Sequence, residues 1–135
     1  MTRTRIVLAG LVALVVCLGL GYAWGASGRG AAEDALADAQ RQLDLAEGRG
    51  RLLDARVNLY NMNFGDATRN FENAKDPLRR ASERYRSEGR GDAASDVDAA
   101  LQRVDEAQRL SGQLDQAANS KAAEALDAIG RAAGR

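Results

Sequence analysis

The sequence predicts an all-α protein in which one N-terminal transmembrane helix precedes an alanine-rich helical hairpin or bundle with coiled-coil-like packing. Three observations support this fold class. No residue from Ile6 to Gly28 is charged. Beyond residue 30, apolar residues recur in steps of three and four, which is the spacing of an amphipathic helix. Valine and isoleucine, which favour strands, are scarce after residue 28, where the helix formers alanine, leucine, glutamate and arginine prevail.

The apolar stretch from Ile6 to Trp24 is long enough for a transmembrane helix. Its 19 residues match the roughly 20 that an α-helix needs to cross a hydrocarbon layer about 30 Å thick. Tyr22 and Trp24 lie at its far end, where aromatic rings favour the headgroup layer. We therefore expect a signal-anchor helix over residues 6–26.

Arg3 and Arg5 set the expected orientation of this helix. Positive charges stay on the cytoplasmic side of a membrane, so residues 1–5 are expected to form a cytoplasmic tail. The C-terminal domain is then extracytoplasmic, in the periplasm of a Gram-negative cell. The chain is expected to be a single-pass protein of the bacterial inner membrane.

Two other interpretations of this segment remain open. A secretory signal peptide has a shorter apolar core and a cleavage site of small residues. Cleavage near residue 26 would release the rest of the chain as a soluble module. A lipoprotein signal through Cys17 fits less well, because the bulky Val16 stands where a small residue is expected.

Small residues recur every four positions along the apolar segment. They form one ridge, which consists of Ala9, Ala13, Cys17, Gly21 and Gly25. Small ridges let two helices approach closely in lipid, so we expect a membrane-helix interface here. The competing explanation is chance, since glycine and alanine are common in such helices.

The remaining sequence divides into a short joint and a helical domain. Glycine at both ends of the segment Gly28–Gly30 predicts a flexible joint over residues 27–30. The domain covers residues 31–135, with helices expected at about 31–47, 50–63, 66–88, 93–118 and 120–133. Gly48 and Gly50 weaken the pattern by about 1 kcal/mol each, so residues 31–63 form either two helices or one.

One apolar stripe follows the first part of this domain. Its members alternate in steps of three and four, as in the seam of a coiled coil. They are Ala32, Leu36, Ala39, Leu43, Ala46, Gly50, Leu53, Val57 and Tyr60.

A turn is expected after Tyr60. Gly65 can take the left-handed conformation that ends a helix, and Asp66 can cap the next helix. The two helices are then antiparallel. Tyr60, Phe64 and Phe71 are expected to pack at the closed end of this hairpin.

Two further features shape the second half of the domain. Pro77 is expected either to kink the helix over residues 66–88 or to begin a new one with Asp76 as its cap. Residues 87–92 contain two glycines and predict a loop.

The apolar stripes define a predicted seam, which is either core or partner surface. Alanine buries little area, so a bundle built from such stripes is thin and leaves apolar surface for a partner. The predicted seam consists of Leu53, Val57, Tyr60, Phe64, Phe71, Val97, Leu101, Val104 and Leu114.

Residues 50–78 carry the spacing of a known repeat. Ala67, Phe71 and Ala74 are followed by Pro77, and Leu53 and Val57 precede them at the interval of a first helix. This hairpin resembles a tetratricopeptide-like unit. The family's usual tryptophan and glycine are replaced by Gly50 and Asp54. The resemblance implies binding of a peptide or protein in a groove between helices.

No constellation for catalysis, cofactor binding or metal binding stands out. The chain has no histidine, so the usual general base and metal ligand are missing. Its only cysteine, Cys17, lies in the apolar segment. Paired carboxylates such as Asp96 with Asp98 are expected on wet helix faces. We therefore expect a protein that is not an enzyme and that uses no cofactor, metal or small-molecule substrate.

The charge pattern argues against a nucleic-acid partner. Without Arg3 and Arg5, 17 basic residues stand against 19 acidic ones, whereas nucleic-acid binders carry a basic excess. The one basic cluster consists of Arg79, Arg80, Arg84, Arg86 and Arg90. Cations near the C-terminus of a helix complement its dipole, which explains this cluster without an anionic ligand.

The sequence therefore predicts a membrane-anchored, non-enzymatic helical adaptor or scaffold. It would contact an envelope protein, a second copy of itself, or both. The alternative is a secreted, soluble binding or chaperone-like module released by cleavage near residue 26.

Overall fold

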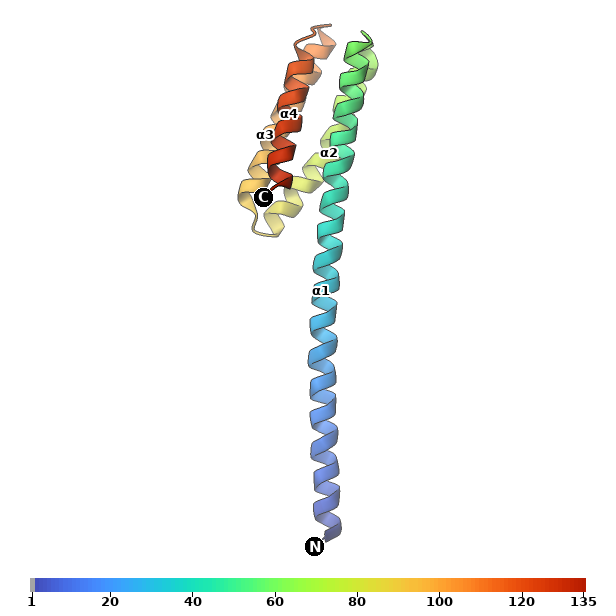
Figure 1. The fold of residues 1–135 in the computed structure, drawn as a ribbon, viewed down its shortest axis with the longest axis vertical. Helices are drawn as coiled ribbons and strands as arrows, with labels where there is room; N and C mark the ends of the chain where they lie inside the picture. The colour runs from blue at the N-terminus through green and yellow to red at the C-terminus, as the bar shows by residue number, and fades with distance from the viewer. Residues whose placement is uncertain (1) are drawn as a thin grey trace. The chain divides into compact units, whose positions relative to one another are not determined.

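The computed structural model describes the backbone of residues 2–135 and the side chains of residues 14–18, 22, 25 and 30–135. Over these residues the chain forms four helices and no strand (Figure 1). The helices are α1 (Thr2–Tyr60), α2 (Phe64–Ser87), α3 (Gly91–Gly112) and α4 (Ala118–Ala133). The prediction of an all-helical protein is confirmed.

The chain divides into two units, Met1–Ala37 and Asp38–Arg135. The described part of the first unit is helical, and it stays helical through residues 27–30, where the sequence predicts a flexible joint. Glycine weakens a helix without forbidding it, so the expected joint is not visible as a break. No helix among the described residues is both long and apolar enough to cross a membrane.

Within the second unit, α1 continues past Gly48 and Gly50 to Tyr60. The helices expected at 31–47 and 50–63 are therefore one. Gly48 is buried, and a Cβ at this position would lie 2.6 Å from Leu78 Cδ2. The missing side chain lets α2 approach α1 closely, so this glycine serves packing between two helices.

Four helical segments build the bundle of the second unit. α2 packs against α3, and α3 against α4, and Figure 1 shows the last two side by side. The last part of α1 reaches α4, where Arg56 Nε donates to Asn119 Oδ1 at 2.7 Å. Apolar residues on each helix recur in steps of three and four and face a common core. Its largest fully buried side chains are Tyr85, Phe71, Leu52, Leu59, Leu78, Val97 and Val104, with alanines between them.

Each of the three turns contains one residue in the left-handed region. Gly89 has a φ of 72°, which glycine adopts readily because it has no Cβ. Met62 and Leu114 have φ values of 59° and 58°, which side chains rarely adopt. Because Leu114 takes this conformation, α3 ends at Gly112 and not at residue 118 as the sequence predicts.

The caps of α2 differ from the expected ones. Asn63 is the N-cap, and its side-chain oxygen accepts a hydrogen bond from the backbone N–H of Asp66 at 3.3 Å. Gly65 and Asp66, expected to end one helix and cap the next, both lie inside α2. Met62 takes the left-handed conformation expected of Gly65.

Pro77 lies inside α2 and neither ends it nor begins another helix. Proline in a helix interior removes one backbone hydrogen bond, at a cost of about 3 kcal/mol. The side chain of Pro77 is buried, as are Ala74 and Leu78 beside it. Packing of this face against the bundle stabilises the helix enough to carry the proline.

Candidate functional site

From Asp38 to Tyr60, α1 has two apolar faces. Successive residues of a helix turn by about 100°, so two series with similar spacing can lie on opposite sides. One series is buried in the bundle and includes Leu45, Gly48, Leu52, Ala55 and Leu59. The other, which we name the α1 stripe, consists of Ala39, Leu43, Ala46, Gly50, Leu53, Val57 and Tyr60.

Six of the seven residues of the α1 stripe are exposed, and Gly50 is half-buried. Leu43 is 66% exposed, Val57 58% and Tyr60 67%, whereas Leu52 and Leu59 on the other face are 0% exposed. Exposed apolar side chains that gather on one part of a surface are typical of a docking site. The α1 stripe is therefore the candidate functional site.

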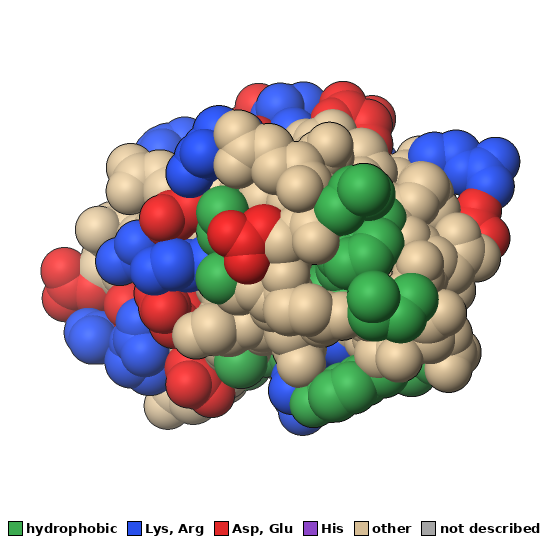
Figure 2. Space-filling model, turned by 90° about the horizontal axis from the view of Figure 1, so that it is seen from above, with side chains coloured by type: hydrophobic (Ala, Val, Ile, Leu, Met, Phe, Trp, Pro, Cys, Tyr) green, Lys and Arg blue, Asp and Glu red, His purple; other side chains and the backbone are tan. Residues whose placement is uncertain are grey.

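Two turn residues add apolar surface at the end of the bundle where α1 ends. Met62 and Leu114 are 64% and 68% exposed, although both occupy strained backbone positions. Gln116 Nε2 donates to Met62 Sδ at 2.8 Å, which ties the turn after α1 to the turn before α4. Figure 2 looks onto this end and shows hydrophobic side chains gathered on one part of the surface and charged side chains crowded along another.

Tyr60 closes the α1 stripe and carries a polar group. A hydrogen bond with Asn119 of α4, followed by the hydrogen bond and positive charge of Arg56, holds the pKa of the Tyr60 phenol below its usual value. Most of the Tyr60 side chain faces solvent.

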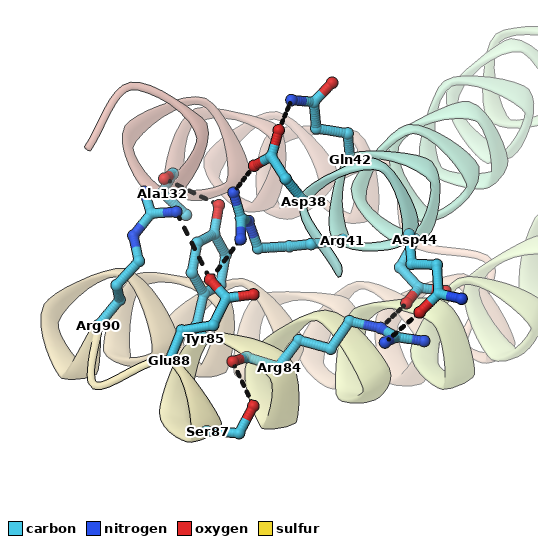
Figure 3. A network of polar contacts seen from close by, with 11 residues as sticks. Asp38, Arg41, Gln42, Asp44, Arg84, Tyr85, Ser87, Glu88, Arg90 and Ala132 are labelled. Carbon is cyan, nitrogen blue, oxygen red and sulfur yellow. Dashed lines mark hydrogen bonds and ion pairs between the residues drawn. The ribbon is translucent and has the colours of Figure 1, made fainter. Parts of the chain in front are cut away.

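Asp44 fixes the other side of α1 to α2. Its side chain is 8% exposed, and its two oxygens accept hydrogen bonds from Arg80 Nε at 2.8 Å and Arg84 Nε at 2.9 Å. Figure 3 shows Arg84 reaching across from α2 to this carboxylate. The contact holds α1 in one rotation about its axis, with the α1 stripe turned outward.

Asp44→Asn is expected to lower the free energy of unfolding by about 1–2 kcal/mol, because two charge-assisted hydrogen bonds lose the carboxylate that accepts them. Urea unfolding followed by circular dichroism measures the change. Asp76→Asn is the matched control, because Asp76 is 78% exposed and pairs with Arg79 on its own helix. This control is expected to lose less than about 0.5 kcal/mol. Equal losses would show that Asp44 has no special role.

Tyr85 forms a second contact between α1, α2 and α4. The guanidinium groups of Arg41 and Arg90 lie 5.0 and 4.7 Å from its ring centre, and both pair with Glu88. The Tyr85 hydroxyl donates to the carbonyl of Ala132 at 3.1 Å. Figure 3 shows the ring between the two arginines. Cation–π contacts are weak at solvent-exposed sites and stronger where the ring is desolvated. Tyr85 is buried, so the stronger case applies here.

A groove of about 570 Å³ lies between α1 and the ends of α2 and α4. Its apolar lining includes Leu45, Ala46 and Ile129, and Arg49 lies at its wall. Ala46 therefore belongs to the α1 stripe and also lines the groove. The groove makes the surface beside the stripe concave.

The structure divides the predicted seam into core and surface. Phe64, Phe71, Val97 and Val104 are buried, and Leu101 packs half-buried against the core. Leu53, Val57, Tyr60 and Leu114 are exposed. The predicted seam residues of α2 and α3 thus hold the bundle together, while those of α1 face solvent.

The predicted membrane-helix interface lies mostly outside the described side chains. Those of Ala9, Ala13 and Gly21 are not described, while Cys17 and Gly25 are exposed. This interface stays a prediction.

The basic cluster is paired within the bundle. Arg80 and Arg84 contact Asp44, Arg86 contacts Asp98, Arg79 contacts Asp76, and Arg90 contacts Glu88. In the part of the chain that the structure describes, no group of three or more acidic, histidine or cysteine side chains could hold a metal ion. Arg80, Arg84 and Arg86 therefore bridge two helices, whereas Arg79 pairs within α2 and Arg90 pairs within the turn that follows it.

Lys75 is a buried charge between α2 and α3. Its ammonium lies 2.7 Å from Asp105 Oδ1 and 3.0 Å from Glu72 Oε2. Burial alone lowers the pKa of Lys75, but the hydrogen bonds with Asp105 and Glu72 outweigh it and raise the pKa above its usual value. The amine therefore stays charged near neutral pH.

No family model, curated protein or solved structure matches the chain. The resemblance to a tetratricopeptide-like unit stays a prediction. Ala67, Phe71 and Ala74 are fully buried, as such a helix requires, but Pro77 lies inside α2, whereas the family's proline follows the second helix.

Sequence reasoning missed three features of this site. It assigned no role to Asp44, to Met62 or to the buried series on α1. The leucines at 45, 52 and 59 recur every seven residues, so the same spacing rule could have found a second apolar face. No local signal marks Asp44, because its partners lie 36 and 40 residues away.

Proposed function

We propose that this chain is a membrane-anchored, non-enzymatic helical adaptor that mediates protein–protein contact in the cell envelope. Its first segment, residues 6–26, anchors it in the bacterial inner membrane, with the N-terminus cytoplasmic and residues 31–135 extracytoplasmic. The bundle presents the α1 stripe to a partner.

The exposure of the α1 stripe carries this proposal. Val57 and Tyr60 remain in solvent although the bundle buries Leu52 and Leu59 on the same helix. Each fully exposed large apolar side chain forgoes about 1.5–3 kcal/mol of burial. A partner surface would recover that free energy.

The electrostatics of the bundle support a non-enzymatic role. The buried amine of Lys75 is held by Asp105 and Glu72, which raises its pKa above the usual value and keeps it charged. Catalytic acids and bases instead need a proton that can move near neutral pH. Support for the anchor comes from the sequence, in the uncharged run from Ile6 to Gly28 preceded by Arg3 and Arg5.

Membrane extraction tests the anchor. We expect the native full-length chain to stay in the membrane pellet after alkaline carbonate washing and to keep residues 1–26 by intact mass. An aqueous product that begins near residue 26 would contradict the anchor and favour the secreted soluble module.

Capture of envelope proteins tests the role of the α1 stripe. In native membranes, the Leu53→Asp/Val57→Asp variant should capture at least about tenfold less cross-linked partner protein than the wild type. Charged groups resist burial in an apolar interface, so the two aspartates weaken the contact. The matched control, Asn73→Asp/Gln102→Asp, adds the same charge at exposed positions of α2 and α3. If both variants capture partners as the wild type does, the stripe is not a docking surface.

A further inference from the structure

We propose that the occupant of the α1 stripe is a second copy of this chain, packed in parallel and in register as a two-stranded coiled coil. This inference rests on the proposed function, because it names the partner of the same surface. The observations that carry it are the spacing of the stripe and the charges that flank it.

The stripe has the repeat of a coiled-coil seam. Leu43, Gly50 and Val57 are seven residues apart and take the a positions, and Ala46, Leu53 and Tyr60 take the d positions. A β-branched residue at a beside leucine at d, as in Val57 with Leu53, favours two parallel strands. Ala46 and Gly50 make the middle of the seam narrow, so the two helices can approach closely there.

The flanking charges choose the orientation. On one side of the seam, the residues immediately before the a positions include Arg49 and Arg56. On the other side, the residues immediately after the d positions include Glu47 and Asp54. In a parallel pair, a residue before an a position lies beside the residue five places later on the partner helix. Arg49 of one copy therefore meets Asp54 of the other, twice by symmetry.

An antiparallel pair would bring equal charges together. In that arrangement the two basic sides face each other, so Arg49 and Arg56 repel their counterparts, and the acidic sides do the same. Equal charges across an interface weaken it and select against that orientation. Charge complementarity thus favours the parallel pair.

Arg49 and Asp54 are also available for this contact. Both are exposed, and neither forms an ion pair within the described part of the chain. By contrast, Asp44 and Glu47 already contact Arg80 of α2. Arg51 is likewise exposed, but it lies one residue beyond an a position, on the outer side of the seam.

The bundle leaves room for the second copy. The buried series of α1 faces α2 and α4, and the α1 stripe lies on the opposite side of the same helix. Two copies can therefore pack stripe to stripe with their bundles on the outside. N-terminal anchors in one membrane would also place two copies in parallel.

Single-cysteine cross-linking tests both the partner and the orientation. In the full-length chain with Cys17→Ser, we expect Leu43→Cys and Val57→Cys each to form disulfide dimers by itself. Only a parallel pair in register brings both positions within the roughly 7 Å between Cα atoms that a disulfide needs. Arg51→Cys, exposed on the outer side, is the control and should react about tenfold more slowly.

Exchange of the flanking charges tests the salt bridge. Arg49→Asp and Asp54→Arg should each raise the dimer dissociation constant about tenfold, because two attractive contacts become repulsive. The double variant Arg49→Asp/Asp54→Arg should return it to within about threefold of the wild type. Sedimentation equilibrium in density-matched detergent measures the constant, with Arg51→Asp as a control of equal charge change.

Three results would overturn the parallel dimer. One is a chain that stays monomeric at about 100 µM, far above the micromolar range of a weak specific pair. Another is disulfide formation only between mixed Leu43→Cys and Val57→Cys chains, which indicates an antiparallel pair. The third is a monomeric chain whose stripe still captures a different envelope protein, which removes the dimer and leaves the proposed function standing.

Discussion

Val104→Asp is expected to lower the free energy of unfolding by about 4 kcal/mol or more and to leave little folded protein. Val104 lies on α3 and is fully buried in the core of the bundle. A carboxylate there loses its hydration without gaining a partner, and a small domain has only about 5–15 kcal/mol of stability to lose. Urea unfolding and the far-ultraviolet circular dichroism signal measure the effect.

The same substitution at Val57 is the matched control. Val57 is 58% exposed, so Val57→Asp should change the stability of the monomer by less than about 0.5 kcal/mol. Its helical signal should stay that of the wild type, while self-association is lost. Equal destabilisation of the two variants would show that the α1 stripe belongs to the folding core and not to an interface.

Gly48→Val has the second large effect, an expected loss of roughly 2–3 kcal/mol of stability from overpacking between α1 and α2. A Cβ at this position would lie 2.6 Å from Leu78 Cδ2 and 2.7 Å from its Cγ. Leu78 is fully buried, so its side chain cannot rotate away, and the helices must separate. Thermal and urea unfolding measure the loss.

Gly50→Ala, two residues further along, should have the opposite sign. A Cβ at Gly50 meets nothing within 4 Å, so alanine brings only its better helix propensity, a gain of about 0.5–1 kcal/mol. If substitution at Gly48 were also stabilising, the close approach of α1 and α2 would be refuted.

Some features followed directly from the pattern of residues. The all-helical class is confirmed, because alanine, leucine, glutamate and arginine favour helices wherever they lie. Gly89 sits in a turn as predicted, since the loop over residues 87–92 needed a residue that accepts a positive φ. The three-four spacing placed Phe71 and Val104 in one apolar seam, and the structure buries both of them.

Other features depended on contacts that local sequence does not reveal. Met62 and Leu114 take left-handed conformations that their side chains disfavour, because the packing of the helices on either side imposes these turns. Gly48 looked like a weak point in a helix and is instead a contact with Leu78. Pro77 stays inside α2 because its face is buried.

The sequence by itself determined the helical class, the amphipathic spacing and the uncharged run from Ile6 to Gly28. Only the tertiary structure decided which apolar face of α1 is buried. The series through Leu45, Leu52 and Leu59 and the series through Leu43, Leu53 and Val57 have the same period, so periodicity alone cannot rank them. The choice comes from Gly48 against Leu78 and from Asp44 between Arg80 and Arg84, contacts that form only when α1 meets α2.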